Sequence, residues 1–188
     1  MYAKDYYEYL KGRSSHSVLY KKIMVYPRVM SKTKGKILDY GCGIGDLISY
    51  NPDIIGVDIN EYCINHCKEQ GFDAYTIKEN RLPFDDNKFT TIILDNVFEH
   101  LPYPEEQFSE IKRVMTDNAT LIIGVPGLKG HSMDDTHIRY YDENLLIESL
   151  NKLGFDHQSF FYTPFVKSSH LSKKLSIYVL WGVFSART

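Results

Sequence analysis

Short apolar segments alternate along the chain with longer segments that have one apolar and one polar face. Five runs are apolar enough to be strands buried on both sides: 36–40, 54–58, 74–77, 91–95 and 120–125. Three of the segments between or after them have the apolar spacing of amphipathic helices: 60–70, 104–115 and 143–153. This alternation predicts one α/β domain built on a mostly parallel sheet.

Two further segments, 155–165 and 175–185, have the alternating pattern of strands. We expect them to form an antiparallel hairpin with 166–173 as its loop, which gives a seven-stranded sheet with an antiparallel last strand. Only residues 46–51 lie between the first strand's turn and Pro52. The first helix of the core should therefore be unusually short.

The first 33 residues are rich in tyrosine and have helical spacing from Val18 to Val29. They predict one or two helices before the first strand, with Pro27 bending or interrupting the second. An amphipathic helix that simply fills one side of the sheet would show the same pattern.

The first strand ends in a glycine-rich turn and the second ends in an acid. Gly41, Gly43 and Gly45 remove side chains where the chain must turn, which lets backbone N–H groups approach a ligand. The carboxyl ends of neighbouring parallel strands meet at one edge of the sheet, where ligands bind. The Asp58 carboxylate is therefore placed to accept hydrogen bonds from both hydroxyls of a ribose.

The spacing of these glycines argues against a dinucleotide ligand. A dinucleotide turn reads G-x-G-x-x-G, whereas residues 41–45 read G-x-G-x-G. Asp39, two residues before the first glycine, is a poor neighbour for a pyrophosphate and a good one for an ammonium or a sulfonium.

Composition excludes several classes of protein. The chain has 188 residues, 43% of them hydrophobic and 24% charged, with a formal net charge of −2, which suits one globular domain. Its basic residues form no stripe, so we expect no nucleic acid partner. Cys63 and Cys67 are four residues apart, but no Cys or His spacing completes a zinc site, and we predict no metal.

No segment has the length of a membrane helix. The longest apolar run, 175–184, is far too short to span a bilayer. The first residues show no charged segment followed by an apolar one, so we expect no secretory signal and a cytoplasmic protein.

Residues 38–45, Leu-Asp-Tyr-Gly-Cys-Gly-Ile-Gly, followed by Gly-Val-Asp-Ile at 56–59, resemble the class I S-adenosylmethionine-dependent methyltransferases that act on small molecules. The resemblance implies one doubly wound, Rossmann-like domain over 1–188. Its expected parts are an N-terminal helical cap, a cofactor-binding core, and a substrate loop with the C-terminal hairpin, at 1–33, 34–125 and 126–188.

The implied reaction is methyl transfer from S-adenosylmethionine to a small-molecule acceptor, with S-adenosylhomocysteine as product. We expect oxygen or nitrogen rather than carbon as the methylated atom, and a monomer or homodimer. Two alternatives are a non-catalytic protein that kept the cofactor site and an NAD-dependent oxidoreductase. The shortened first helix and Lys78 leave the first alternative open.

The resemblance also implies the cofactor contacts, all at strand ends or in turns: Asp39, Gly41, Gly43, Asp58, Ile59, Asn80, Asp95 and Asn96. Asp58 would hold the ribose, Ile59 would pack on the adenine face, and Asp39 would lie near the ammonium group. Just before the loop at 79–89, four residues ahead of Leu82, Lys78 stands where the family usually has an acid. Asn80, with Glu79 as the alternative, is expected to bind the adenine amine instead.

On the acceptor side, Glu99 and His100 follow the fourth strand and are expected to shape the substrate site. The long loop 126–142 contains a His-x-Arg-aromatic element that resembles one in small-molecule members of the family. Its residues His137, Arg139 and Tyr140 complete the predicted acceptor site.

His137 is our first candidate for a general base and His100 the second, because a histidine titrates near neutral pH. Each histidine has a purely structural alternative, a local hydrogen bond or a contact that pins the loop. Arg139 is expected either to bind an anionic group of the substrate or to pair with a neighbouring aspartate. His131 is expected to be a solvated loop residue.

Overall fold

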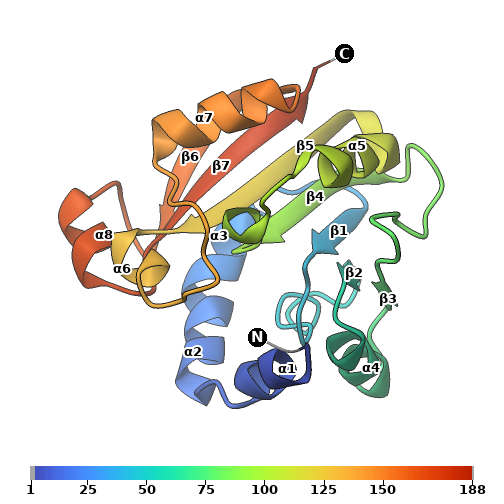
Figure 1. Cartoon of the computed structure of the whole chain (residues 1–188), viewed down its shortest axis with the longest axis horizontal. Coiled ribbons are helices and arrows are strands. Elements are labelled where there is room, and N and C mark those ends of the chain that lie inside the picture. The colour runs from blue at the N-terminus through green and yellow to red at the C-terminus, as the bar shows by residue number, and fades with distance from the viewer. Residues whose placement is uncertain (1–2, 188) are drawn as a thin grey trace.

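The computed structural model describes residues 3–187, which form a layered α/β domain (Figure 1). Within this range one seven-stranded sheet has the order β3-β2-β1-β4-β5-β7-β6. The strands are β1 Ile37–Tyr40, β2 Ile55–Asp58, β3 Ala74–Thr76, β4 Phe89–Asp95, β5 Met115–Pro126, β6 Phe155–Thr163 and β7 Val179–Ala186. The first five pair in parallel, and β7 runs antiparallel to both β5 and β6. The predicted fold class is confirmed.

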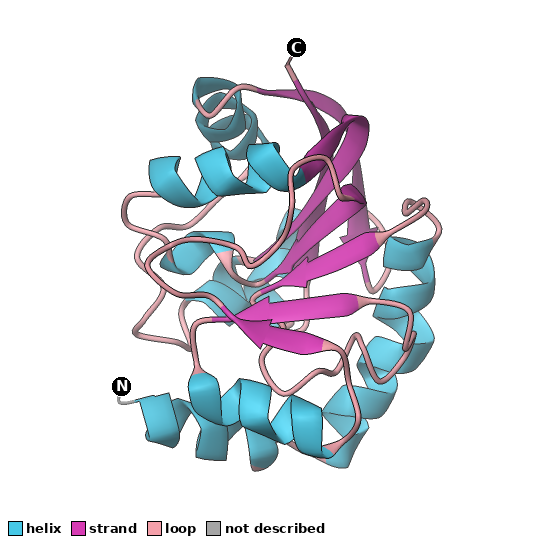
Figure 2. Ribbon diagram, turned by 90° about the vertical axis from the view of Figure 1, so that its right-hand side faces the viewer, coloured by secondary structure: helices cyan, strands magenta, loops and turns pink. Residues whose placement is uncertain are grey.

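Helices lie on both sides of the sheet (Figure 2). They are α1 Ala3–Lys11, α2 Ser15–Tyr20, α3 Tyr26–Met30, α4 Glu61–Glu69, α5 Glu105–Val114, α6 Leu128–His131, α7 Glu143–Lys152 and α8 Ser169–Lys174. A π-helical turn at Lys21–Val25 joins α2 to α3, and a 3₁₀ turn at Phe98–His100 follows β4. No helix within residues 3–187 has the length and apolar character needed to cross a bilayer.

Neighbouring residues of the central strands fill two different cores. Ile93 of β4 belongs to the cluster that contains Val25 and Val29 from the N-terminal helices. Ile92 belongs to the cluster that contains Phe108 of α5. Because successive side chains of a strand point to opposite faces, a sheet covered on both sides needs apolar residues at every position. This is why the strands read as continuous apolar runs in the sequence.

The expected short helix after β1 does not form. Residues 46–50 are a series of turns, with bonds from Ser49 N to Gly45 O at 2.8 Å and from Asn51 N to Leu47 O at 3.1 Å. Six residues before Pro52 leave too little chain for consecutive helical bonds beyond a first turn.

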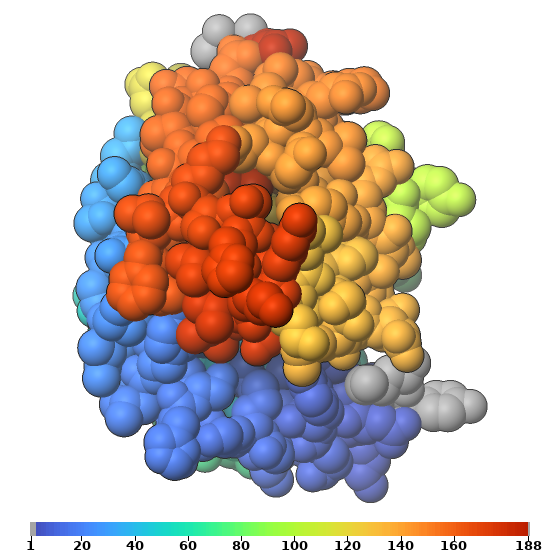
Figure 3. Space-filling view, turned by 90° about the vertical axis from the view of Figure 1, so that its left-hand side faces the viewer, coloured from blue at the N-terminus to red at the C-terminus, as the bar shows by residue number. Residues whose placement is uncertain are grey.

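The N-terminal segment is helical from Ser15 to Met30 without a break at Pro27. The helical ladder widens instead into the π-helical turn just before this proline, which begins α3 where its missing N–H costs little. Arg28 of α3 donates to the carbonyl of Tyr162 in the edge strand β6 at 2.9 Å and to that of Phe165, just after this strand, at 3.2 Å. Figure 3 shows the N-terminal helices (blue) and this C-terminal segment (orange to red) meeting on one face.

The C-terminal hairpin is confirmed, but its connection is longer than expected. β7 begins at Val179 rather than at 175, and α8 lies within the connection. The Ser168 side chain caps α8 by accepting from Leu171 N at 3.2 Å. The segment expected to be a loop therefore contains a short capped helix, and the second strand begins four residues later than its alternation predicted.

Replacing Phe108 by alanine tests the core. Its ring is 1% exposed and lies 5.3 Å from Phe98 and 5.7 Å from Phe155, centre to centre. We expect a loss of about 3–5 kcal/mol in the free energy of unfolding, measured by urea denaturation. Tyr103→Ala, at a side chain 80% exposed, is the control and should change stability by less than about 0.5 kcal/mol.

Candidate active site

The glycine turn after β1 is fastened to the end of β2. Gly41 N and Cys42 N donate to Val57 O at 2.8 and 2.9 Å, and Gly43 N donates to Asp58 Oδ2 at 2.8 Å. Gly41, Gly43 and Gly45 have φ values of 81°, 53° and 83°, the left-handed region that glycine enters without strain.

Neighbouring side chains also leave little room in this turn. A Cβ on Gly41 would lie 2.4 Å from Val97 Cγ2, and one on Gly43 would lie 3.1 Å from Leu10 Cδ1 of α1. The turn therefore exposes bare backbone at the carboxyl edge of the sheet, which lets a ligand approach the main chain closely.

Asp58 has acceptor capacity beyond its backbone bonds. Its Oδ1 accepts from Asn60 N at 2.8 Å while Oδ2 holds the glycine turn. Burial raises the pKa of Asp58, although the N–H groups of Asn60 and Gly43 oppose the rise. A carboxylate has about four lone-pair sites, so two remain for the hydroxyls of a ribose.

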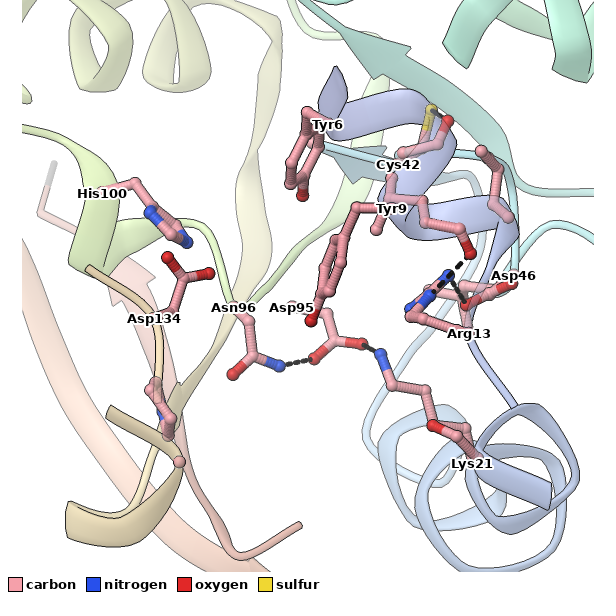
Figure 4. Close-up of a pocket in the computed structure, with 18 of the residues that line it drawn as sticks. Tyr6, Tyr9, Arg13, Lys21, Cys42, Asp46, Asp95, Asn96, His100 and Asp134 are labelled. Atoms are coloured by element: carbon pink, nitrogen blue, oxygen red, sulfur yellow. Dashed lines mark hydrogen bonds and ion pairs between the residues drawn. The ribbon is translucent and has the colours of Figure 1, made fainter. Parts of the chain in front are cut away.

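A cavity of about 380 Å³ lies in front of the glycine turn (Figure 4). Its walls come from α1, α2 and the π-helical turn on one side. The glycine turn, the end of β4 and the segment after β5 complete them. The polar side chains among its lining residues are Tyr6, Tyr9, Arg13, Ser17, Lys21, Tyr26, Asp39, Asp46, Asp95, Asn96, His100, Asp134, His137 and Ser176.

Two ion pairs border the cavity on the side of the N-terminal helices. Arg13 Nη2 lies 2.6 Å from Asp46 Oδ2, and Lys21 Nζ lies 2.9 Å from Asp95 Oδ2. Burial by itself lowers the pKa of Lys21, but Asp95 more than offsets this and the net shift is upward. Asn96 Nδ2 also donates to Asp95 Oδ1 at 2.6 Å, so both oxygens of that carboxylate are held (Figure 4).

Asp39 faces the same cavity and is 3% exposed. Burial raises its pKa well above the usual range, and the negative charge of Asp95 raises it further, while Lys21 opposes the shift. An added cation beside Asp39 would stabilise its ionised form. Bare backbone and two buried acids at one edge of the sheet together fit a ligand that, like S-adenosylmethionine, carries positive charge and hydroxyl groups.

Glu99, His100 and His137 meet at the other end of the cavity. Ile138 N donates to Glu99 O at 3.0 Å, which holds the loop after β5 against the turn after β4. His137 Nε2 then lies 3.7 Å from Glu99 Oε1, and the rings of His100 and His137 are 4.7 Å apart. Burial raises the pKa of Glu99 to about 8, and Asp95 and Asp134 contribute in the same direction.

Six of the predicted site residues are not among those that line the cavity: Asp58, Ile59, Asn80, Glu99, Arg139 and Tyr140. Ile59 is 75% exposed beside Asp58, a free apolar surface next to the ribose acceptor. Asn80 Nδ2 donates to Glu106 Oε2 at 2.8 Å, which ties its side chain to α5. Arg139 is exposed, and Tyr140 lies 5.6 Å from the His131 ring. Among residues 3–187 Arg139 forms no ion pair with an aspartate.

Sequence reasoning did not single out several residues of the cavity, foremost Tyr6, Tyr9, Arg13, Lys21 and Asp134. A helical spacing does not tell which polar residues of an N-terminal helix turn towards a ligand. His131 is also not a solvated residue: it is half-buried, its carbonyl accepts from His137 Nδ1 at 2.9 Å, and its ring lies 5.2 Å from the His137 ring.

Comparisons with known proteins agree with this site. Residues 38–123 match a sequence family described as a methyltransferase domain. An uncharacterised protein of Methanocaldococcus jannaschii is 29% identical over 160 residues, 79% of this chain and 77% of that protein. The 24-methylenesterol C-methyltransferase 2 of Arabidopsis thaliana is 32% identical over 130 residues, 61% of this chain but only 36% of that enzyme.

A solved S-adenosylmethionine-dependent methyltransferase from Aquifex aeolicus has the same fold. It superposes with a TM-score of 0.72 over 99% of both chains at 17% identity. With the matched domain and the glycine turn and acid described above, the chain belongs to the class I S-adenosylmethionine-dependent methyltransferases. It is an enzyme that uses S-adenosylmethionine, and the NAD-dependent and non-catalytic alternatives are set aside.

Gly43→Ala should weaken binding of S-adenosylhomocysteine by about tenfold or more, because the new methyl group strains the turn and stands beside Leu10. Isothermal titration calorimetry measures this. Gly71→Ala is the matched control: its φ of 79° imposes backbone strain too, but nothing lies within 4 Å of the new Cβ. An equal loss of affinity in both variants would contradict a direct role of the turn.

Proposed function

We propose that this methyltransferase acts on an oxygen or nitrogen atom of a small polar molecule, bound at the histidine end of the cavity. The observation that carries the proposal is that His100, Asp134 and His137 line the same cavity as the glycine turn. An acceptor held by these side chains would face a methyl donor held by the turn. A small molecule is the partner that we propose, and a monomer or homodimer in the cytoplasm stays a prediction.

The size of the cavity supports a small acceptor. Its volume of about 380 Å³ is near the lower end of small-molecule sites, which span about 300–1,000 Å³. Cofactor and acceptor would have to share this space together with the open surface beside Ile59.

The proposed cofactor contacts are the residues expected from the sequence, with two additions. Asp58 would hold the ribose, and Gly41, Gly43 and Asp39 the methionine part. Ile59 and Asn80 would contact the adenine, and Asp95 and Asn96 would border the methionine chain. Lys21 and Arg13 are additional candidates for the cofactor's carboxylate, because both cations point into the cavity (Figure 4).

S-adenosylmethionine supplies an activated methyl group, so the residues of this chain mainly align the acceptor and exclude water. A neutral hydroxyl or amine must lose a proton in the transfer. His137 Nδ1 donates to His131 O, so Nε2, which lies 3.7 Å from Glu99 Oε1, is the ring nitrogen that would accept a proton. We propose that His137, with His100 beside it, promotes the loss of that proton from the acceptor.

A carbon acceptor is the second candidate, because two plant sterol C-methyltransferases are among the relatives in sequence. A sterol requires a large apolar site, whereas the lining of this cavity is rich in charged and imidazole groups. The polar lining favours oxygen or nitrogen.

Incubation with methyl-labelled S-adenosylmethionine and fractionated metabolites identifies the acceptor. We expect label in a small polar compound, and mass spectrometry with NMR of the product would show a methyl group on oxygen or nitrogen. Label on a carbon atom would contradict the proposed acceptor type. If no fraction gains label and S-adenosylhomocysteine also fails to bind, the proposed function is wrong.

His137→Ala should lower turnover at least about 100-fold while the Kd for S-adenosylhomocysteine changes less than about threefold, because His137 lies at the acceptor end. Single-turnover kinetics and calorimetry measure the two effects. His170→Ala, at an exposed position of α8, is the control. Unchanged turnover in His137→Ala would exclude a role for that imidazole in the reaction.

A further inference from the structure

Three side chains that offer metal-ligand atoms converge beside the acceptor end of the cavity. One ligand atom from each of Glu99, His100 and His137 lies within 4.8 Å of the other two, and His137 Nε2 is 3.7 Å from Glu99 Oε1. His100 and His137 line the cavity, and Glu99 stands behind them, fully buried.

The hydrogen bonds of both histidines fix which nitrogen is free. His137 Nδ1 lies 2.9 Å from His131 O, and His100 Nδ1 lies 3.2 Å from Thr136 O. A carbonyl oxygen only accepts, so each Nδ1 carries a proton, and in the neutral imidazole each Nε2 keeps its lone pair. A bond from the second ring nitrogen to a backbone carbonyl is the arrangement that orients metal-binding histidines.

Glu99 has no hydrogen-bond partner among residues 3–187 that would explain its burial, and its ion-pair contact there is with His137 Nε2 at 3.7 Å. Neither carboxylate oxygen accepts a hydrogen bond from any residue in 3–187, and no lysine or arginine in that range pairs with it. A buried carboxylate without hydrogen bonds is costly. The Nε2 atoms of the two neutral imidazoles beside it are acceptors as well and donate no hydrogen bond to the carboxylate. A positive charge between the three groups would satisfy all of them.

We propose that Glu99, His100 and His137 bind a divalent transition-metal ion whose open coordination positions face the cavity and take a hydroxyl oxygen of the acceptor. The metal site itself does not depend on the proposed function. Only the statement that the acceptor takes the open positions rests on it. It departs from the sequence-based prediction that the protein has no metal.

The ligand set suits such an ion. Imidazole and carboxylate together fit zinc, iron(II), cobalt(II) or manganese(II), and two histidines with one carboxylate are typical of sites that keep positions open for a substrate. Ligand atoms bound at about 2.1 Å to one tetrahedral ion lie about 3.4 Å apart. The separation of 3.7 Å between His137 and Glu99 is already close to this value.

Asp134 stands on the cavity side of the cluster. Figure 4 shows its carboxylate pointing towards the His100 ring, and its Oδ1 accepts from Thr136 Oγ1 at 2.6 Å. It is placed either to be a fourth ligand or to accept a hydrogen bond from the acceptor. In both roles it closes the site on the side that the acceptor enters.

The ion would favour a hydroxyl-bearing acceptor over an amine that is protonated at neutral pH. Coordination lowers the pKa of the hydroxyl, and its proton passes to water or to Asp134. The bond from the acceptor oxygen to the methyl carbon forms as the carbon–sulfur bond breaks, and the electron pair of that bond stays on sulfur. With both Nε2 atoms bound to the ion, neither histidine takes the proton.

Metal binding is measurable without any acceptor. Protein dialysed against EDTA is titrated with Zn²⁺ by calorimetry and with Co²⁺ by absorption spectroscopy. We expect one ion per chain, d–d bands from cobalt bound to nitrogen and oxygen, and Mg²⁺ at least about 100-fold weaker. Glu99→Gln should weaken Zn²⁺ binding about 100-fold. Glu148→Gln, at an exposed glutamate paired with Lys152, is the control.

Because Glu99 is buried, His100→Ala provides a second variant at a half-exposed ligand, with the same expected loss of Zn²⁺ affinity. Stoichiometric Zn²⁺ binding that is unaffected in both variants, or no binding below millimolar concentration, would overturn the proposal. S-adenosylhomocysteine binding to the EDTA-treated protein is followed in parallel. If that ligand binds and metal does not, the metal site is wrong and the proposed function stands; if metal binds and the ligand does not, the proposed function fails.

Discussion

The hydrogen bond from Gly43 N to Asp58 Oδ2 joins the two strand ends on which the cofactor site depends. The glycine turn has positive φ at three positions and little regular structure after it, so its shape needs an external contact. Asp58 supplies that contact and is itself held at the end of β2 by Asn60 N. The same carboxylate that would bind the ribose thus fixes the backbone beside it. A change at Asp58 would therefore affect both structure and binding.

Two segments far apart in sequence close the cavity around this turn. The N-terminal segment contributes two cations, Arg13 after α1 and Lys21 in the π-helical turn. Arg13 pairs with Asp46 and Lys21 pairs with Asp95. Asn60 Nδ2 also donates to Ala3 O at 2.7 Å, which fastens α1 beside the end of β2. The N-terminal helical segment is thus part of the cavity wall. Asp39 also lines the cavity, and it forms no ion pair with any residue in 3–187.

At the acceptor end of the cavity, too, a single backbone hydrogen bond joins two segments that are far apart in the sequence. The hydrogen bond from Ile138 N to Glu99 O holds a loop after β5 against the turn after β4. The side chains of His137 and Glu99 are thereby brought close together. Most buried carboxylates have hydrogen-bond donors around them. Glu99 has lone pairs as neighbours instead, which is unfavourable unless a proton or a metal ion is shared among them. This electrostatic conflict is the reason for proposing a metal ion at the cluster.

The amino-acid sequence alone was enough to predict the strands, their mostly parallel arrangement and the edge of the sheet where the cofactor is expected. Continuous apolar runs give parallel strands buried on both faces, and the glycine spacing with Asp39 and Asp58 selects an adenosyl sulfonium over a dinucleotide. These features are short motifs at the ends of two strands that follow one another in the chain, so the order of residues along the sequence is enough to detect them.

Tertiary structure decided the rest of the site. It placed Lys21 at the wall of the cavity and formed α8 in a segment expected to be a loop. It also brought Glu99 to within 3.7 Å of His137, 38 positions later in the chain. Burial without a donor, the property that makes Glu99 informative, is a property of the surroundings. The physical reason is that side-chain direction and solvation depend on what packs across the sheet edge, which no periodicity along the chain records.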